Sequence, residues 1–306
     1  MGKTREIKGR MKAVGNIKRI TRTMQLIATA RYQAAFRRVV ASRPFTQKLG
    51  ELVGELSSAL AAAGQSSGGF SHPLLQAPAT PTGRELLLII TSNRGLCGGY
   101  NGKIFHAARE HWLSQTDRTL DLELVGKKGQ AILRFNKREV AAFHAQFGDK
   151  PAYDEVEKLA DRYMAEFTQG RYDAVRVAYM AFQSAGRQFP RVMQLLPMED
   201  PTKSELGATT QALPEAGSQA GVTYDFSPDP QELLHELLPM TVRTMLFQAF
   251  NEAILSEQVA RMVAMKAATD AAGKMGKLLT RQYNRARQTA ITTELMEVIS
   301  GAAALG

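Results

Sequence analysis

One stretch decides the fold: residues 240–270 read MTVRTMLFQAFNEAILSEQVARMVAMKAATD. Apolar or small side chains recur there at alternating steps of four and three residues, which predicts one face of a long α-helix. The stripe comprises Val242, Leu246, Ala249, Ala253, Ser256, Ala260, Val263 and Ala267, and it continues at Leu279, Tyr283, Ala286 and Ala290. Because most of these side chains are small, a partner helix can approach closely, and a repeat of about 3.5 residues favours a left-handed supercoil.

The partner helix is expected at the other end of the chain. No proline precedes Pro44, and none follows Pro239. Thr4 is the expected N-cap of the first helix, and Pro44 is expected to kink or break that helix near Ser42 and Arg43. The expected apolar seam consists of Ala13, Ile17, Ile20, Met24, Ile27 and Ala34. We therefore predict a long antiparallel coiled coil that pairs a helix over residues 1–60 with a helix over residues 228–306.

Between these helices the sequence changes to β-rich runs separated by Gly and Pro. Strands that alternate with helices imply a mostly parallel sheet, so we predict a Rossmann-like α/β domain over residues 84–197. The expected strands are Glu85–Thr91, Leu120–Val125, residues 138–145, Tyr172–Phe182 and Arg191–Leu196. The expected helices are Asn101–Gln115, residues 127–135 and Asp154–Gln169, the last with Asp154 as N-cap and Gly170 as stop. Residues 198–227 are expected to form a mobile loop.

The positive charge of the chain lies near its N-terminus. The first 40 residues contain eleven Lys or Arg and one acid, Glu6, and so carry the entire formal net charge of +10. A positively charged helix predicts an acidic surface, nucleic acid or anionic lipid as its partner. No apolar run approaches the roughly 18 residues that span a bilayer. The single cysteine, Cys97, excludes an internal disulfide.

A glycine-rich run, NRGLCGGYNGK at residues 93–103, lies between an expected strand and an expected helix, where phosphate-binding loops occur. A P-loop needs glycine five residues before Gly102, but Cys97 stands there, and Ile104 replaces the Ser or Thr that follows the lysine. The run therefore favours a tight structural turn over a nucleotide site, with Cys97 as a semi-buried structural thiol. The five histidines lack metal-ligand spacing, and we predict no catalytic, cofactor or metal site.

Three interpretations of the basic helix remain beside the acidic protein partner that we favour. The charges can form the solvated face of a coiled coil. Nucleic-acid binding is possible, although only Tyr32 and Phe36 supply aromatic side chains and no DNA-binding module surrounds them. A membrane-surface helix would carry Trp, Phe or Leu opposite the charges, whereas this face carries Ala, Ile and Met.

Several sequence blocks carry a resemblance to a known family. They are SEQVARMVAMKAATD at residues 256–270, YNRARQ at 283–288, ITTEL at 291–295, TSNRGLCGGYN at 91–101, ASRP at 41–44, and the segment from Ile7 to Met24. Together these blocks closely resemble the gamma subunit of the rotary F-type ATP synthase, which forms its central stalk. Residues 198–223 lack the cysteine pair of the chloroplast relatives, so thiol switching is not expected.

The resemblance implies a non-catalytic rotor shaft that couples proton flow to ATP synthesis or hydrolysis and contributes to its regulation. The coiled coil would turn inside a hexamer of alpha and beta subunits, and the α/β domain would hold the epsilon subunit and the membrane c-ring. No nucleic acid, cofactor or direct membrane insertion is implied, and the expected location is the cytoplasmic face of a bacterial plasma membrane. The rotor–hexamer contacts carried over are Arg22, Met24, Gln258, Arg261, Gln288, Thr292 and Glu294.

Overall fold

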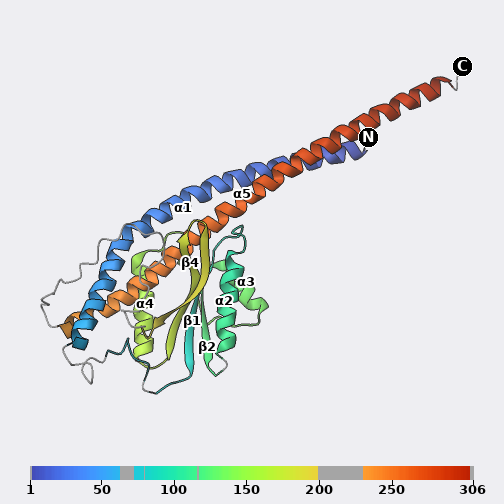
Figure 1. Cartoon of the computed structure of the whole chain (residues 1–306). Coiled ribbons are helices and arrows are strands. Elements are labelled where there is room, and N and C mark those ends of the chain that lie inside the picture. Colours follow the sequence, from blue (N-terminus) through green and yellow to red (C-terminus); the bar gives the residue numbers. More distant parts are fainter. Residues whose placement is uncertain (1, 63–71, 79, 116, 199–229, 304–306) are drawn as a thin grey trace. The chain divides into compact units, whose positions relative to one another are not determined.

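The computed structural model describes residues 2–62, 72–78, 80–115, 117–198 and 230–303. They form two long helices, α1 (Gly2–Ala62) and α5 (Pro230–Ala303), with an α/β domain between them in the chain (Figure 1). The elements of that domain are β1 (Arg84–Ile90), α2 (Tyr100–Ser114), β2 (Thr119–Val125), α3 (Lys127–Phe135), β3 (Ala142–His144), α4 (Tyr153–Thr168), β4 (Ala174–Ser184) and β5 (Arg187–Leu196). Apart from Met198, the predicted mobile loop lies outside the described residues. None of the described helices is apolar over a length that could cross a membrane.

The strands form one five-stranded sheet in the order β3-β2-β1-β4-β5. The first four are parallel, and β5 runs antiparallel to β4. The prediction of a mostly parallel sheet is therefore confirmed. The last strand begins at Arg187 rather than at the predicted Arg191, because Ala185 and Gly186 close a short hairpin turn between β4 and β5.

Strand β1 is buried along nearly its whole length because helices cover both faces of the sheet. Leu86, Leu88 and Ile90 belong to the core on the side of α4 and the first part of α5. Leu87 and Ile89 belong to the core on the side of α2. Successive residues of this apolar run therefore pack alternately into the two cores on opposite faces of the sheet.

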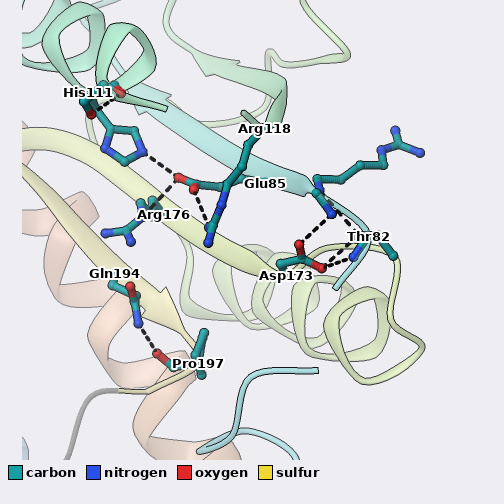
Figure 2. A network of polar contacts seen from close by, with 11 residues as sticks. Thr82, Glu85, His111, Arg118, Asp173, Arg176, Gln194 and Pro197 are labelled. Carbon is teal, nitrogen blue, oxygen red and sulfur yellow. Dashed lines mark hydrogen bonds and ion pairs between the residues drawn. The ribbon is translucent and has the colours of Figure 1, made fainter. Parts of the chain in front are cut away.

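A network of ion pairs surrounds the buried carboxylate of Glu85 at the beginning of β1 (Figure 2). Glu85 is fully buried, and basic side chains from three other places in the domain converge on it. They are His111 at 2.6 Å, Arg176 at 3.0 Å and Arg118 at 3.4 Å. Burial alone would raise the pKa of the Glu85 carboxyl, but the His111 hydrogen bond and the neighbouring positive charges outweigh it, so this pKa is lowered. The network joins β1, β4 and α2 at the edge of the sheet opposite the glycine-rich loop.

Both predicted N-caps are wrong. Thr4 lies inside α1, which begins at Gly2. Asp154 lies in the first turn of α4, whose N-cap is Ala152. A carboxylate in the first turn still favours the helix through the macrodipole, without capping a backbone N–H. The predicted stop is confirmed, because Gly170 follows α4 with φ of 73°.

Of the predicted kink or break at Pro44, the break is wrong, since α1 continues through this residue, and the kink stays a prediction. Proline deprives the carbonyl of Val40 of its usual helical N–H donor. On both sides of the proline, however, the helix buries side chains in the core, namely Val39, Thr46 and Leu49. Packing of this stretch therefore outweighs one missing hydrogen bond.

The chain divides into two compact units. One unit, here called the helical pair, joins residues 1–30 to residues 261–306. The other, here called the base, comprises residues 31–260 and contains the α/β domain with the adjoining parts of α1 and α5. Both long helices pass without interruption from one unit into the other.

Candidate functional site

The helical pair is held together by a seam of small and polar side chains. Its buried residues are Thr21 and Ala28 on α1 and Arg261, Met265, Thr269, Ala272 and Leu279 on α5. The Thr269 hydroxyl donates to the Thr21 hydroxyl at 2.8 Å. Lys18, one turn before Thr21, lies beside Gly273, one turn after Thr269, so the helices run antiparallel as predicted.

The predicted seam of α1 is wrong. Ile17, Ile20 and Ile27 are 50%, 59% and 49% exposed, and Ala13 and Ala34 are exposed as well. Only Met24 of the predicted set is half-buried. The reason is steric: Thr21 and Ala28 let the two helices approach more closely than branched isoleucine side chains would.

The stripe predicted on α5 is confirmed in the base and again from Leu279 onward, and it is wrong only at Val263 and Ala267. Val242, Leu246, Ala249, Ala253 and Ser256 are buried there, and Ala260 is half-buried. In the helical pair, however, Val263 is 55% exposed and Ala267 is exposed, and the buried face shifts to Met265 and Thr269. Leu279 is buried again, and Tyr283, Ala286 and Ala290 are half-buried. The buried face of α5 therefore departs from the predicted stripe only between Ala260 and Leu279.

The outer surface of the helical pair carries many large apolar side chains. On α1 they include Leu26 besides the three isoleucines, and on α5 they are Val263, Met275, Leu278, Ile291, Leu295, Met296, Val298 and Ile299. All residues from 291 to 303 are exposed. Exposed apolar side chains in this number, interspersed with Lys and Arg, are typical of an interaction surface.

An open groove runs along the helical pair between Val14 and Gly15 of α1 and Ala272, Gly273 and Gly276 of α5. The missing side chains of the glycines leave this space. Lys18, Lys274 and Lys277 line it together with one acid, Asp270. The groove is therefore positively charged, like the first helix as a whole.

The seven predicted contact residues lie in two kinds of environment. Arg22, Gln288, Thr292 and Glu294 are exposed on the helical pair, and Met24 is half-buried. Gln288 and Thr292 share one face of α5, where the Thr292 hydroxyl donates to the Gln288 carbonyl at 3.0 Å. Gln258 and Arg261 are only 1% and 7% exposed. The side-chain amide of Gln258 has no hydrogen-bond partner among the residues that the structure describes.

The glycine-rich run forms a turn that satisfies its own polar groups. Asn101 accepts from the Ser92 backbone N–H at 3.0 Å and donates to the Ser92 hydroxyl at 2.8 Å. Cys97 is 3% exposed, and its thiol lies 3.6 Å from the Ser92 hydroxyl, so it is fully buried rather than semi-buried as predicted. Tyr100 then donates to the Ala253 carbonyl of α5 at 2.9 Å. The run therefore docks the α/β domain on α5, which supports the structural reading.

The carboxyl edge of the sheet, where doubly wound folds bind nucleotides, is filled by the chain itself. Thr91 donates from its hydroxyl to the Val125 carbonyl at 2.7 Å. Gly126 follows with φ of 95°, and a Cβ on it would lie 2.2 Å from the Thr91 carbonyl oxygen. Asn93 bridges the Phe147 carbonyl and the Lys127 N–H, at 2.9 and 3.2 Å. Within the described ranges no cluster of His, Cys, Asp or Glu is arranged to hold a metal ion.

Comparison with known proteins agrees with this geometry. A family model described as ATP synthase matches residues 3–305. The ATP synthase gamma chain of Rhodopirellula baltica is 40% identical over 307 residues, which cover 100% of this chain and 99% of that one. The chain belongs to the ATP synthase gamma-chain family. The gamma chain of Gemmatimonas aurantiaca is 36% identical, again over 100% of this chain and 99% of its own length.

Solved structures show the same fold at lower identity. The rotor of Euglena gracilis mitochondrial ATP synthase matches with a TM-score of 0.62 and 16% identity, covering 95% of this chain and 99% of that one. A chain of the Tetrahymena thermophila central stalk and c-ring matches with a TM-score of 0.52 and 22% identity, covering 81% and 99%. Members of the gamma-chain family are non-catalytic subunits, which explains why an α/β domain of this type carries a filled nucleotide edge.

Proposed function

We propose that this chain is the rotor shaft of an F-type ATP synthase and couples proton flow through a membrane c-ring to ATP synthesis or hydrolysis in an alpha–beta hexamer. The observation that carries the proposal is the match to gamma chains over the full length of both proteins. The helical pair supplies the shaft. The side chains of its seam are buried between α1 and α5, whereas the apolar side chains of its outer surface are exposed and available to a partner.

The outer surface suits a bearing inside a hexamer. Its exposed apolar side chains and screened, solvated charges give individually weak contacts, so none of them locks the shaft at one angle. We assign Arg22, Met24, Gln288, Thr292 and Glu294 to direct contact with the alpha and beta subunits. Gln258 and Arg261 are buried within their own chain. We assign them an indirect role in the same contact, because they hold α5 in the position in which it meets the hexamer.

The base is proposed to hold the epsilon subunit and the c-ring. Structural neighbours of this chain come from complexes whose descriptions include F1, the rotor and the c-ring. The corresponding location is the cytoplasmic face of a bacterial plasma membrane, with the shaft bound peripherally. The filled carboxyl edge of the sheet favours this mechanical role over the alternative of a nucleotide enzyme built around residues 95–103.

Reconstitution of the complete complex in vesicles tests the function. With this chain, ATP hydrolysis should drive proton uptake, and deletion of residues 1–20 should abolish the coupling. A sharper test compares two exposed apolar residues, Ile20 on the helical pair and Leu113 on α2, 59% and 58% exposed. Ile20→Ser should weaken binding of the chain to the hexamer by about tenfold, whereas Leu113→Ser should leave it unchanged. Equal affinity of both variants, or full coupling after the deletion, would refute the proposal.

A further inference from the structure

The first turns of α1 within the base are tied to the α/β domain by one carboxylate, Asp149. It accepts a hydrogen bond from the guanidinium of Arg31, and the Arg94 guanidinium lies 3.5 Å from the same carboxylate oxygen. Arg38 donates to the backbone carbonyl of Asp149 at 3.4 Å. Arg31 and Arg38 lie seven residues apart, so both project from one face of α1 two turns apart. Asp149, a single loop residue, therefore binds α1 at two positions that lie two helical turns apart.

The loop that carries Asp149 is itself firmly held. Phe147, two residues earlier, is 2% exposed, and its ring centroid lies 4.5 Å from that of Phe250 on α5. The Phe147 carbonyl accepts from the Asn93 side chain at 2.9 Å, which links it to the loop after β1. Pro151, two residues later, is buried. Asp149 is thus anchored to both the sheet and α5.

Apolar packing alone specifies the rotation of α1 poorly here. The stretch buries Ala35 and Val39 in a cluster with Phe182, Ile254, Leu255 and Val259, and half-buried Tyr32 packs on the same cluster. The two side chains that α1 itself buries in this cluster, Ala35 and Val39, are small or β-branched, and such side chains allow a helix to roll with little change in contact area. Directed hydrogen bonds from two arginines to one fixed residue resist such rolling.

These contacts lie close to the boundary at which α1 passes from the base into the helical pair. Arg31 is the first residue of the base, and Ala30 is the last residue of α1 in the helical pair. Only α1 and α5 connect the two units through the chain, so torque between them passes through these two helices. We propose that Asp149 is a positioning residue for rotary coupling, which fixes α1 on the base at the point where torque enters the helical pair.

This inference rests on the proposed rotor function but concerns a residue that sequence patterns do not single out. Removal of this ion pair can also distinguish a role in positioning α1 from a role in the stability of the fold. The Arg31 and Asp149 side chains are 39% and 33% exposed, and ion pairs of this exposure contribute little to the stability of a fold. Loss of the carboxylate should therefore leave the chain folded while α1 gains rotational freedom.

The test uses the complete complex in vesicles with Asp149→Asn and three comparison variants. Asp149→Glu keeps the charge, Arg31→Gln removes the same contact from the helix side, and Glu51→Gln removes an exposed carboxylate elsewhere on α1 that pairs with Lys48 one turn away. Protons taken up per ATP hydrolysed are measured. In parallel, the angular variance of a bead is measured, with the bead attached through Leu113→Cys, because the native Cys97 is buried.

Asp149→Asn and Arg31→Gln should each raise the angular variance by about two-fold and lower the protons moved per ATP by a similar factor, since one of the two polar contacts between α1 and Asp149 is weakened while the bond from Arg38 to the backbone carbonyl remains. Asp149→Glu and Glu51→Gln should match the wild type, and the melting temperature of all four should stay within about 2 °C of the wild type. Wild-type variance and coupling in both Asp149→Asn and Arg31→Gln would overturn the inference, as would unfolding of both. A wild-type complex that hydrolyses ATP without pumping would instead refute the rotor function itself.

Discussion

Replacement of Glu123 by Gln should destabilise the base strongly at neutral pH and much less in acid. Glu123 is 3% exposed in the middle of β2. Three donors share one of its carboxylate oxygens: His144 at 2.7 Å, Arg162 at 2.5 Å and the Tyr163 hydroxyl at 2.7 Å. Gln has the same shape and can place its carbonyl oxygen where the donors point. The substitution therefore removes the charge and keeps the acceptor.

The magnitude follows from the pKa of the carboxyl. Burial raises this pKa, but the hydrogen bonds from His144, Arg162 and Tyr163 and the charge of Arg162 outweigh burial, and they lower it from 4.5 to about 2. That difference corresponds to about 3 kcal/mol of stability at pH 7. Because the folded-state pKa lies below the unfolded-state value, the contribution is complete above pH 4.5 and is lost as the pH falls toward 2. At pH 3 about half of it remains.

The assay is urea unfolding followed by the fluorescence of Trp112, the only tryptophan, which is buried in the base. Glu123→Gln should lower the free energy of unfolding by about 3 kcal/mol at pH 7 and by about half as much at pH 3. Glu139→Gln, at an exposed position after α3, should change it by less than about 0.5 kcal/mol at either pH. An equal loss at both pH values, or a loss no larger than that of Glu139→Gln, would refute the reasoning.

Two further substitutions probe the closed edge of the sheet and the shaft. Gly126→Ala should prevent accumulation of soluble chain or lower stability by more than about 3 kcal/mol, because the new Cβ would meet the Thr91 carbonyl at 2.2 Å; a melting curve like that of the wild type would contradict this. Met24→Lys adds a charge at a half-buried position of the helical pair and should reduce the protons pumped per ATP while the complex still assembles. Wild-type coupling in the Met24 variant would count against Met24 as a rotor–hexamer contact.

The α/β domain could be predicted from the sequence because its signals are local and unambiguous. The run from Glu85 to Ile90 is apolar at nearly every position, and only a strand covered on both faces has that requirement. Gly170 could be recognised as a helix stop because a residue with positive φ was needed there. The buried networks around Glu85 and Glu123 could not be predicted, because their partners come from elements far apart in the sequence.

The predicted contact residues differ in the environment that the structure gives them, and their role as contacts stays a prediction. The family motifs identify Arg22, Gln288 and Glu294, all of which are exposed. They also include Gln258 and Arg261, whose burial no motif reveals. Asp149 has no signal in the sequence at all, since an aspartate in a loop between a strand and a helix is ordinary. Only the fold brings it to the arginines of α1.

The error in the α1 seam has a physical cause that bears on the proposed function. Hydrophobic periodicity marks the faces of a helix that are covered, but it does not say by which partner. In an ordinary globular protein the second face meets water and is polar, so a single apolar stripe identifies the core. Here α1 has a small-residue face at Thr21 and Ala28 that meets α5, and a larger apolar face at Ile17, Ile20 and Ile27 that is exposed. In the rotor that we propose, a shaft enclosed by a hexamer has no face left for water, and we therefore assign its more hydrophobic stripe to the interface with the other subunits.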